Sequence, residues 1–175
     1  MKKTIRFSFR TKGFTLIELL VVIAIIGLLS SIVLASLSTA RAKARDAQRL
    51  SDLTQIRNAL ALYYSTNGSY PLPGNGMYWG GVNAGPSCAS INGTVSGATA
   101  YISGLVPTYI PVLPVDPSPP APDCRGYLYH SDGKDYMFLI YYTVEGAVPP
   151  ASLQRPIEPG QKIYAIWSGP NAAGW

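Results

Sequence analysis

Residues 12–29 read KGFTLIELLVVIAIIGLL, an apolar run that contains a single carboxylate, Glu18. Glu18 is also the only formally charged side chain between Lys12 and Arg41. An apolar segment of this length suits a helix that spans a bilayer, for which about 20 residues suffice. An ionisable group inside such a helix is costly and usually functional. The position of Glu18 therefore indicates a function, and its carboxylate requires a partner.

The charges of the chain are unevenly distributed. The 175 residues carry a formal net charge of +5, and the excess comes from five basic residues ahead of the apolar run: Lys2, Lys3, Arg6, Arg10 and Lys12. The remainder is neutral, so nucleic acid is not an expected partner, because binding it requires cationic charge on the folded surface. Basic residues beside a membrane helix stay in the cytoplasm, which places the part after the helix outside.

Two ordinary explanations of the N-terminal segment fit it incompletely. A cleaved secretory signal has an apolar centre of about 7–15 residues and a small-residue cleavage site. Ala42-Lys43-Ala44 offers such a site, but the apolar stretch is too long and Glu18 has no place in it. A plain signal anchor fits the length and the orientation, yet it leaves Glu18 unexplained.

The run from Lys12 to Gly27 closely resembles the class III signal of type IV pilins and type II secretion pseudopilins, which has Gly, Phe and Glu at these spacings. The resemblance implies that a membrane-embedded prepilin peptidase cuts between Gly13 and Phe14 and that Phe14 is then N-methylated. Glycine suits the cut, because a side chain there would obstruct close approach to the scissile carbonyl.

The same resemblance gives Glu18 a partner. After cleavage Glu18 is the fifth residue of the mature chain, one helical turn from the new amino group of Phe14. The family implies that its carboxylate meets this amine, in the same or a neighbouring subunit, within the filament core. Because such a pair is strong at low dielectric, we expect Glu18 to set the register of assembly. The alternative is that Glu18 only complements the helix dipole.

A single long helix is expected after the signal. No proline occurs before Pro71, which permits a continuous helix over about 15–66. Asn67-Gly68 then ends the helix, and Pro71 prevents its resumption. The segment from residue 52 to Pro71 also resembles pilin-like proteins, major pseudopilins in particular.

The helix changes character at Arg41. Beyond this residue, apolar side chains recur at intervals of three and four, which predicts one buried stripe: Leu50, Leu53, Ile56, Leu60 and Tyr63. Another face carries Arg41, Arg45 and Arg49, with Asp46 and Asp52 interleaved. We interpret these charges as a solvated surface in preference to a subunit-facing one.

The external part combines irregular segments with short strands. Residues 71–126 are rich in Gly, Pro, Ser and Asn and are expected to be irregular. Within them, residues 113–117 read Leu-Pro-Val-Asp-Pro and resemble the Leu-Pro-x-Asp-Pro turn of major pseudopilins. Strands are predicted at 126–129, 136–144 and 162–167, the first two joined by a hairpin.

These elements predict an α+β, type IV pilin-like fold, in which the membrane-embedded first half of a long N-terminal α-helix is followed by a half that packs against a small antiparallel sheet. Four parts are expected. They are a leader peptide at 1–13, a transmembrane or filament-core helix at 14–40, its amphipathic continuation at 41–68 and an extracytoplasmic head at 69–175.

Two cysteines, Cys88 and Cys124, fall in the external part, and only one pairing is possible within the chain. An oxidising compartment permits that disulfide, which closes a loop worth about 3–4 kcal/mol in the chain-entropy model. The alternative is two free thiols. The chain contains no C-x-x-C, so a redox enzyme is not indicated.

No catalytic site or cofactor is expected. His130 is the only histidine, without the partners of a nucleophilic triad, and we assign it a structural role. No bound metal is predicted. Asp132 and Asp135 bracket a glycine and are the calcium candidates, as a related loop in major pseudopilins implies, but the acidic C-terminal pattern of that family is missing.

The sequence thus predicts a structural subunit, a prepilin, of a type IV pilus or a type II secretion pseudopilus. The resemblance implies a prepilin peptidase, identical and related subunits, an assembly platform and an ATPase as partners. The chain would cross the cytoplasmic (inner) membrane once, with its N-terminus inside, and then enter an extracellular or periplasmic filament. The alternative function is a membrane-anchored extracytoplasmic binding module that uses the helix only as a tether.

Overall fold

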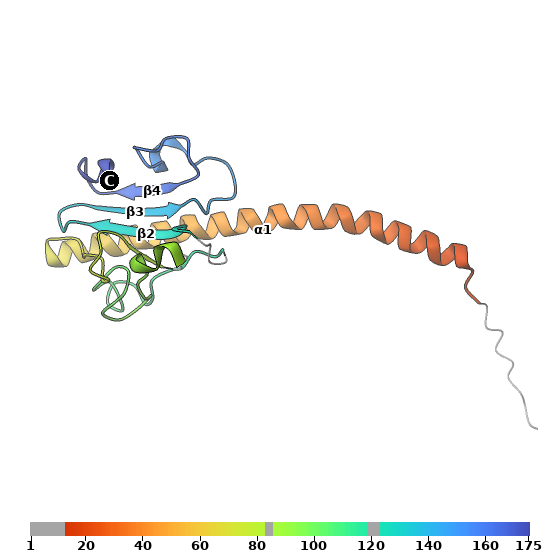
Figure 1. Ribbon diagram of the computed structural model, residues 1–175, viewed down its shortest axis with the longest axis horizontal. Coiled ribbons are helices and arrows are strands. Elements are labelled where there is room, and N and C mark those ends of the chain that lie inside the picture. The colour runs from red at the N-terminus through yellow and green to blue at the C-terminus, as the bar shows by residue number, and fades with distance from the viewer. Residues whose placement is uncertain (1–12, 83–85, 119–122) are drawn as a thin grey trace, which may run out of the picture. The chain divides into compact units, whose positions relative to one another are not determined.

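The computed structural model describes residues 13–82, 86–118 and 123–175 (Figure 1). Residues 1–12, which hold nearly all of the expected leader, lie outside the described residues. The chain divides into two compact units, of which one ends at Ala40 and the other is formed by Arg41–Trp175. Each unit is described by itself.

One α-helix, α1, runs through Leu16–Asn67 without interruption. Its end has a simple cause, because Gly68 adopts a φ of +70° that residues with a side chain rarely tolerate. The amide of Gly68 donates to the carbonyl of Tyr64 at 2.8 Å, which satisfies one of the last free carbonyl groups of the helix. The predicted continuous helix and its glycine stop are confirmed.

The first unit is the apolar part of α1. Every large apolar side chain from Leu16 to Leu37 is exposed, with exposed fractions between 41% and 83%. The helix is long and apolar enough to cross a membrane by its length and composition, since it contains an 18-residue stretch with a mean hydropathy of 2.8. A surface of this kind is stable in lipid or against other apolar helices, and costly in water.

The second unit contains a four-stranded antiparallel sheet in the order β1-β2-β3-β4. The strands are Gly80–Val82 (β1), Gly126–Ser131 (β2), Tyr136–Tyr141 (β3) and Tyr164–Trp167 (β4). Two predictions about strands were wrong. Strand β3 stops at Tyr141 and does not continue to 144, since Tyr142 has a φ of +52°. The short, glycine-containing β1 lies in a segment expected to be irregular.

The sheet separates two apolar clusters. Its inner face packs on the stripe of α1, and this main core includes Leu53, Ile56, Leu60, Tyr127 and Phe138. The outer face carries a smaller cluster around Leu128, Met137 and Leu139, because neighbouring residues of a strand point to opposite faces. The α+β, pilin-like fold and the buried stripe are therefore confirmed.

Candidate functional site

The expected cleavage position lies just ahead of α1. Gly13 and Phe14 are both exposed, Phe14 at 78%. A Cβ atom added at Gly13 would meet no heavy atom within 4 Å. The described part of the chain therefore does not itself require glycine at this position. A requirement for glycine would come from a molecule that approaches the chain from outside.

Glu18 has a partner within the chain, and the sequence analysis missed it. Its Oε2 accepts hydrogen bonds from the amide of Thr15 at 2.9 Å and from the Thr15 hydroxyl at 2.7 Å. The Glu18 amide in turn donates to the Thr15 hydroxyl oxygen at 3.3 Å. This is a capping box, in which the residue before the helix and the third helical residue satisfy each other's amides. The spacing Thr-x-x-Glu was the signal that could have revealed it.

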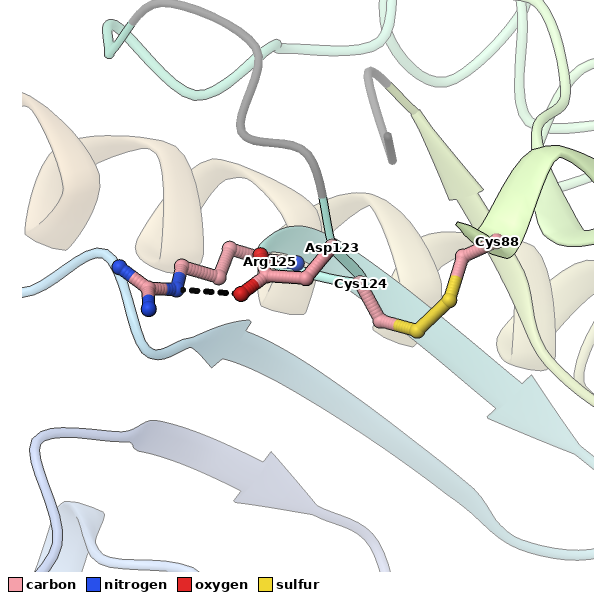
Figure 2. The surroundings of a disulfide bond; sticks show 4 residues. All are labelled: Cys88, Asp123, Cys124 and Arg125. Atoms are coloured by element: carbon pink, nitrogen blue, oxygen red, sulfur yellow. Dashed lines mark hydrogen bonds and ion pairs between the residues drawn. A yellow bond between two sulfur atoms is a disulfide. The ribbon is translucent and has the colours of Figure 1, made fainter. Parts of the chain in front are cut away.

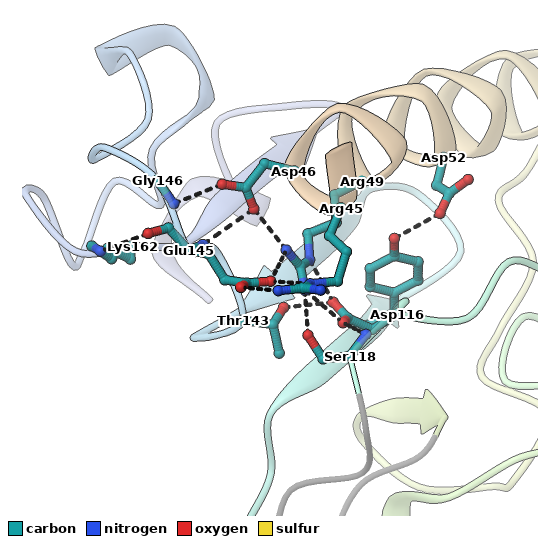
Figure 3. Close-up of polar contacts among 11 residues, drawn as sticks. Arg45, Asp46, Arg49, Asp52, Asp116, Ser118, Thr143, Glu145, Gly146 and Lys162 are labelled. Atoms are coloured by element: carbon teal, nitrogen blue, oxygen red, sulfur yellow. Dashed lines mark hydrogen bonds and ion pairs between the residues drawn. The ribbon is translucent and has the colours of Figure 1, made fainter. Parts of the chain in front are cut away.

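In the second unit, the centre of the polar contacts is Arg49, which is completely buried (Figure 3). Its Nε and Nη2 donate to the two carboxylate oxygens of Asp116, both at 2.9 Å. Asp116 also accepts hydrogen bonds from the hydroxyl of Thr143 at 2.6 Å and from the amide of Ser118 at 2.8 Å. A bidentate arginine–carboxylate pair of this kind is strong and geometrically specific. It ties α1 to the Leu-Pro-Val-Asp-Pro turn, from which Asp116 comes.

A second layer of charges surrounds this pair. Arg49 Nη1 lies 2.6 Å from Asp46 and 3.3 Å from Glu145, and Arg45 forms its own ion pair with Glu145. The carboxylate of Asp46 accepts the amides of Glu145 at 3.1 Å and Gly146 at 2.7 Å. The interpretation of the arginine face as solvated was therefore wrong for Arg49, which is buried, whereas Arg45 keeps a side-chain exposure of 34% while it pairs with Glu145. Both arginines reach across to the segment that follows β3.

The two buried carboxylates of this region differ in their ionisation. Burial raises the pKa of Asp116, but the hydrogen bonds from Arg49, Thr143 and Ser118 outweigh it and hold the pKa below its ordinary value. Asp52 is buried with a hydrogen bond from the Tyr127 hydroxyl at 2.7 Å. Burial raises the pKa of Asp52, and this hydrogen bond offsets the rise only in part. Asp116 is thus stabilised as an anion, whereas Asp52 is driven toward its neutral form.

Cys88 and Cys124 are joined by a disulfide with a Cα–Cα distance of 5.3 Å (Figure 2). The bond connects the 3-10 helix Pro86–Ile91 to the residues just ahead of β2. Beside it, Asp123 and Arg125 form an exposed ion pair at 3.0 Å. The structure therefore selects the disulfide over two free thiols and shows that it fastens an irregular segment to the sheet.

The hairpin between β2 and β3 holds the two calcium candidates. Asp132 Oδ1 accepts the amides of Lys134 and Asp135, both at 2.8 Å, which makes a turn of the Asx type. Asp135 accepts the hydroxyl of Ser168 at 2.8 Å. Among the described residues, no three His, Cys, Asp or Glu side chains are grouped so as to hold a metal ion. Both carboxylates bind donors of the chain itself.

His130 is buried in an aromatic cluster on β2. Its ring stacks on Tyr78 at a centroid distance of 3.7 Å and meets the edge of Trp175 at 4.3 Å. Burial lowers the pKa of His130, although the contact of its ring with the Tyr78 carbonyl acts in the opposite direction. These contacts give the imidazole the role of a packing residue.

The described side chains therefore form two polar arrangements, one exposed and one buried. The segment from Gly13 to Glu18 exposes a helix start with an ordered carboxylate, and the cluster around Arg49 locks the head onto α1. Together with the apolar first half of α1 and the small sheet on its second half, they define a pilin-like class of protein.

Comparisons with known proteins agree with this class. The family model described as the prokaryotic N-terminal methylation motif matches residues 8–34. The chain is 39% identical to the type II secretion system core protein G of Escherichia coli K12 over 72 residues, which is 41% of this chain and 50% of that protein. The protein of the same name from Aeromonas hydrophila is 40% identical over 68 residues, 39% of this chain and 48% of that protein.

The likeness covers only about half of each of these proteins. The core protein G of Vibrio cholerae is 37% identical over 65 residues, 37% of this chain and 44% of its own. The chain thus spans about half the length of the curated relatives it matches. No solved structure matches the chain. The resemblance to the pilin and pseudopilin family is confirmed over this segment.

Proposed function

We propose that this chain is a prepilin, a structural subunit of a pseudopilus of the type II secretion kind, and that it acts by assembly and not by catalysis. The observation that carries the proposal is the first half of α1. No other described residue covers its apolar side chains, and a capped carboxylate lies at its start. Bilayer lipid before assembly and the helices of other subunits afterwards would supply that cover.

The proposed maturation begins at the glycine. A membrane-embedded prepilin peptidase would cut between Gly13 and Phe14, remove the leader at 1–13 and leave Phe14 to be N-methylated. The exposure of both residues and the open space around Gly13 support access by such an enzyme. In this proposal, residues 14–40 are the membrane or filament-core helix, 41–68 its continuation and 69–175 the head.

Glu18 would then direct assembly. In the precursor its Oε2 accepts the hydrogen bonds of Thr15, so the carboxylate is already ordered at the helix start. Cleavage creates an amino group on Phe14, four residues away, and a carboxylate retains a second oxygen that can accept it. An ion pair between Glu18 and the Phe14 amine of a neighbouring subunit forms at one axial offset only, which supports a role in register.

The proposed location and partners are those that the resemblance to pseudopilins implies. The subunit would wait in the inner membrane with its N-terminus in the cytoplasm and its head outside, where an oxidising compartment suits the disulfide. A platform protein and an ATPase would add it to a periplasmic filament of identical and related subunits. The similarity to the core protein G of several bacteria favours this pseudopilus over a surface pilus.

Processing and assembly variants test the proposal in a host that carries the assembly machinery. We expect Gly13→Leu to leave precursor of full length on a gel, because the peptidase would lose access to the bond. We expect Glu18→Ala to be processed but to lower the yield of sheared filaments at least about tenfold. Glu158→Ala is the matched control, since Glu158 lies in the head and pairs with Arg155.

Two results would contradict the proposal. Normal filaments from Glu18→Ala would remove the role of the carboxylate. Full function after replacement of residues 1–40 by an unrelated membrane anchor would instead establish the tethered binding module.

A further inference from the structure

The ion pairs of the second unit leave a few charges without an opposite partner. Among the described residues, each acidic side chain of Arg41–Trp175 except three is in an ion pair. The three are Asp52, Asp132 and Asp135, and only Asp132 is fully exposed. On α1, the cations outside any ion pair of the described chain are Arg41, Lys43 and Arg57.

Asp132 and Arg41 lie at opposite ends of the second unit. The hairpin that carries Asp132 is held beside the end of α1, where the Tyr70 amide donates to the Gly133 carbonyl at 2.8 Å (Figure 1). Arg41 stands at the other end, where the unit begins. The helix from Arg41 to Asn67 is about 40 Å long at 1.5 Å per residue. Each subunit therefore has a negative tip and a positive base.

The negative charge at the tip is the ionised carboxylate of Asp132. The amides of Asp135 and Lys134 lower the pKa of Asp132, which keeps its carboxylate ionised across the neutral range. Asp135 is half-buried and already accepts the Ser168 hydroxyl. Lys134 is an exposed cation in the same hairpin and reduces its net charge, so Asp132 is the group that a cation would approach.

The charge at the base is oriented by the helix. Arg41 precedes Arg45 by four residues and Arg49 by eight, and both of these arginines reach the head. Residues four apart lie on one face of a helix, so Arg41 lies on the face that carries the head. Lys43 is two residues further on and therefore lies on the opposite face. Of Arg41 and Lys43, Arg41 is therefore the one on the helix face that would meet the head of a second copy placed at the Arg41 end of the unit.

We propose that Arg41 of one copy of this chain binds Asp132 of a second copy, head to tail, as an electrostatic contact between stacked heads. The inference rests on the proposed function, because it places both copies in one filament. The contact joins two different patches, so it repeats without closing and generates an open helical array. Opposite charges at the two ends also exclude tip-to-tip and base-to-base pairing.

Charge reversal tests this contact in the full chain, expressed with the assembly machinery and measured as sheared filament per processed subunit. We expect Arg41→Asp and Asp132→Arg each to lower the yield about tenfold, because each places like charges together. The double variant should recover most of the yield. Lys43→Asp is the matched control on the opposite helix face and should assemble normally. Asp132→Asn keeps an oxygen for the turn amides and should lower the yield less than reversal.

The outcomes separate the two proposals. If the wild type forms no filaments, the proposed function is overturned, and the contact with it. If the wild type assembles and both reversals assemble as well, only the contact is overturned. Loss in Arg41→Asp without recovery in the double variant also overturns it, and would direct attention to another anionic partner of Arg41, such as the phosphate groups of lipid.

Discussion

Residues 16–40 and 41–67 form one continuous helix, yet their side chains meet different surroundings. In the first half, large apolar side chains are exposed on every side, at 41–83%. In the second half, one stripe that includes Leu53, Ile56 and Leu60 is buried under the sheet, and the exposed large apolar side chains are only Leu62 and Tyr64 among mainly polar or small residues. The helix backbone is the same in both, so the difference lies in what covers the side chains.

The charged residues of the two halves differ in the same way. Glu18 is satisfied locally, by the residue three positions earlier. Arg49 is satisfied by Asp116, which is 67 residues away in the sequence. A helix without its own head can satisfy a charge only nearby or in another chain, whereas a helix under a head can bury one. Under the proposed function, the first half would therefore exchange lipid for other helices, and the second half would stay attached to its own head.

The largest expected effect comes from removal of the buried cation in the second half. Arg49→Met leaves Asp116 buried without its bidentate partner, so we expect the free energy of unfolding to fall by about 3–5 kcal/mol. Urea titration of the full chain in detergent, followed by near-UV circular dichroism, measures this loss. Arg57→Met is the control, because Arg57 is exposed and should change the stability by less than about 0.5 kcal/mol. Equal urea midpoints for Arg49→Met and Arg57→Met would show that the Arg49–Asp116 pair does not hold the head on α1.

A new carboxylate should distinguish the two halves directly. Ile25→Asp places an unpaired charge in the middle of the apolar half, and we expect membrane insertion to lose about 2.5–3.5 kcal/mol. Gln55→Asp places the same charge on an exposed face of the second half and should cost less than about 1 kcal/mol. The fraction of chain that resists carbonate extraction of membranes measures insertion. Indistinguishable fractions would show that the first half is not in lipid.

A smaller effect is expected from pH, and it should have two opposite phases. The pKa of Asp52 is raised by burial, so its contribution to stability is complete below the ordinary value of 3.8 and is lost as the pH rises through the folded pKa. The pKa of Asp116 is lowered by its hydrogen bonds despite burial, so its contribution is lost as the pH falls below 3.8.

Stability should therefore increase slightly as the pH falls from 7 toward about 4, and then decrease. Asp52→Asn should abolish the increase and retain the decrease. Urea midpoints between pH 3 and pH 7 measure both phases. A monotonic curve in the wild type would contradict the opposite ionisation of the two carboxylates.

Several features were predictable because they depend on neighbouring residues. The continuous helix followed from the lack of proline, its end from Asn67-Gly68, and the buried stripe from the spacing of apolar residues. The hairpin between β2 and β3 followed from alternating strands around a glycine turn. The capping box was equally accessible through the spacing of Thr15 and Glu18, although it was overlooked.

Other features had no local signal. Strand β1 has three residues, two of them glycine, and exists because it pairs with β2. The face with Arg45 and Arg49 looked solvated, since charged residues on a helix usually are. Only the approach of Asp116 and Glu145 from distant segments buried Arg49 and brought Arg45 into an ion pair.

The sequence by itself determined the long helix, the apolar character of its first half and the place of Glu18, the only carboxylate in that half. These depend on the order of residues along one element, where hydrogen bonds and side-chain neighbours lie within four positions. The tertiary structure alone decided which charges of the second half of α1 are buried and where the disulfide fastens the head. Those properties depend on contacts between segments far apart in the chain, and no local pattern encodes which segments meet.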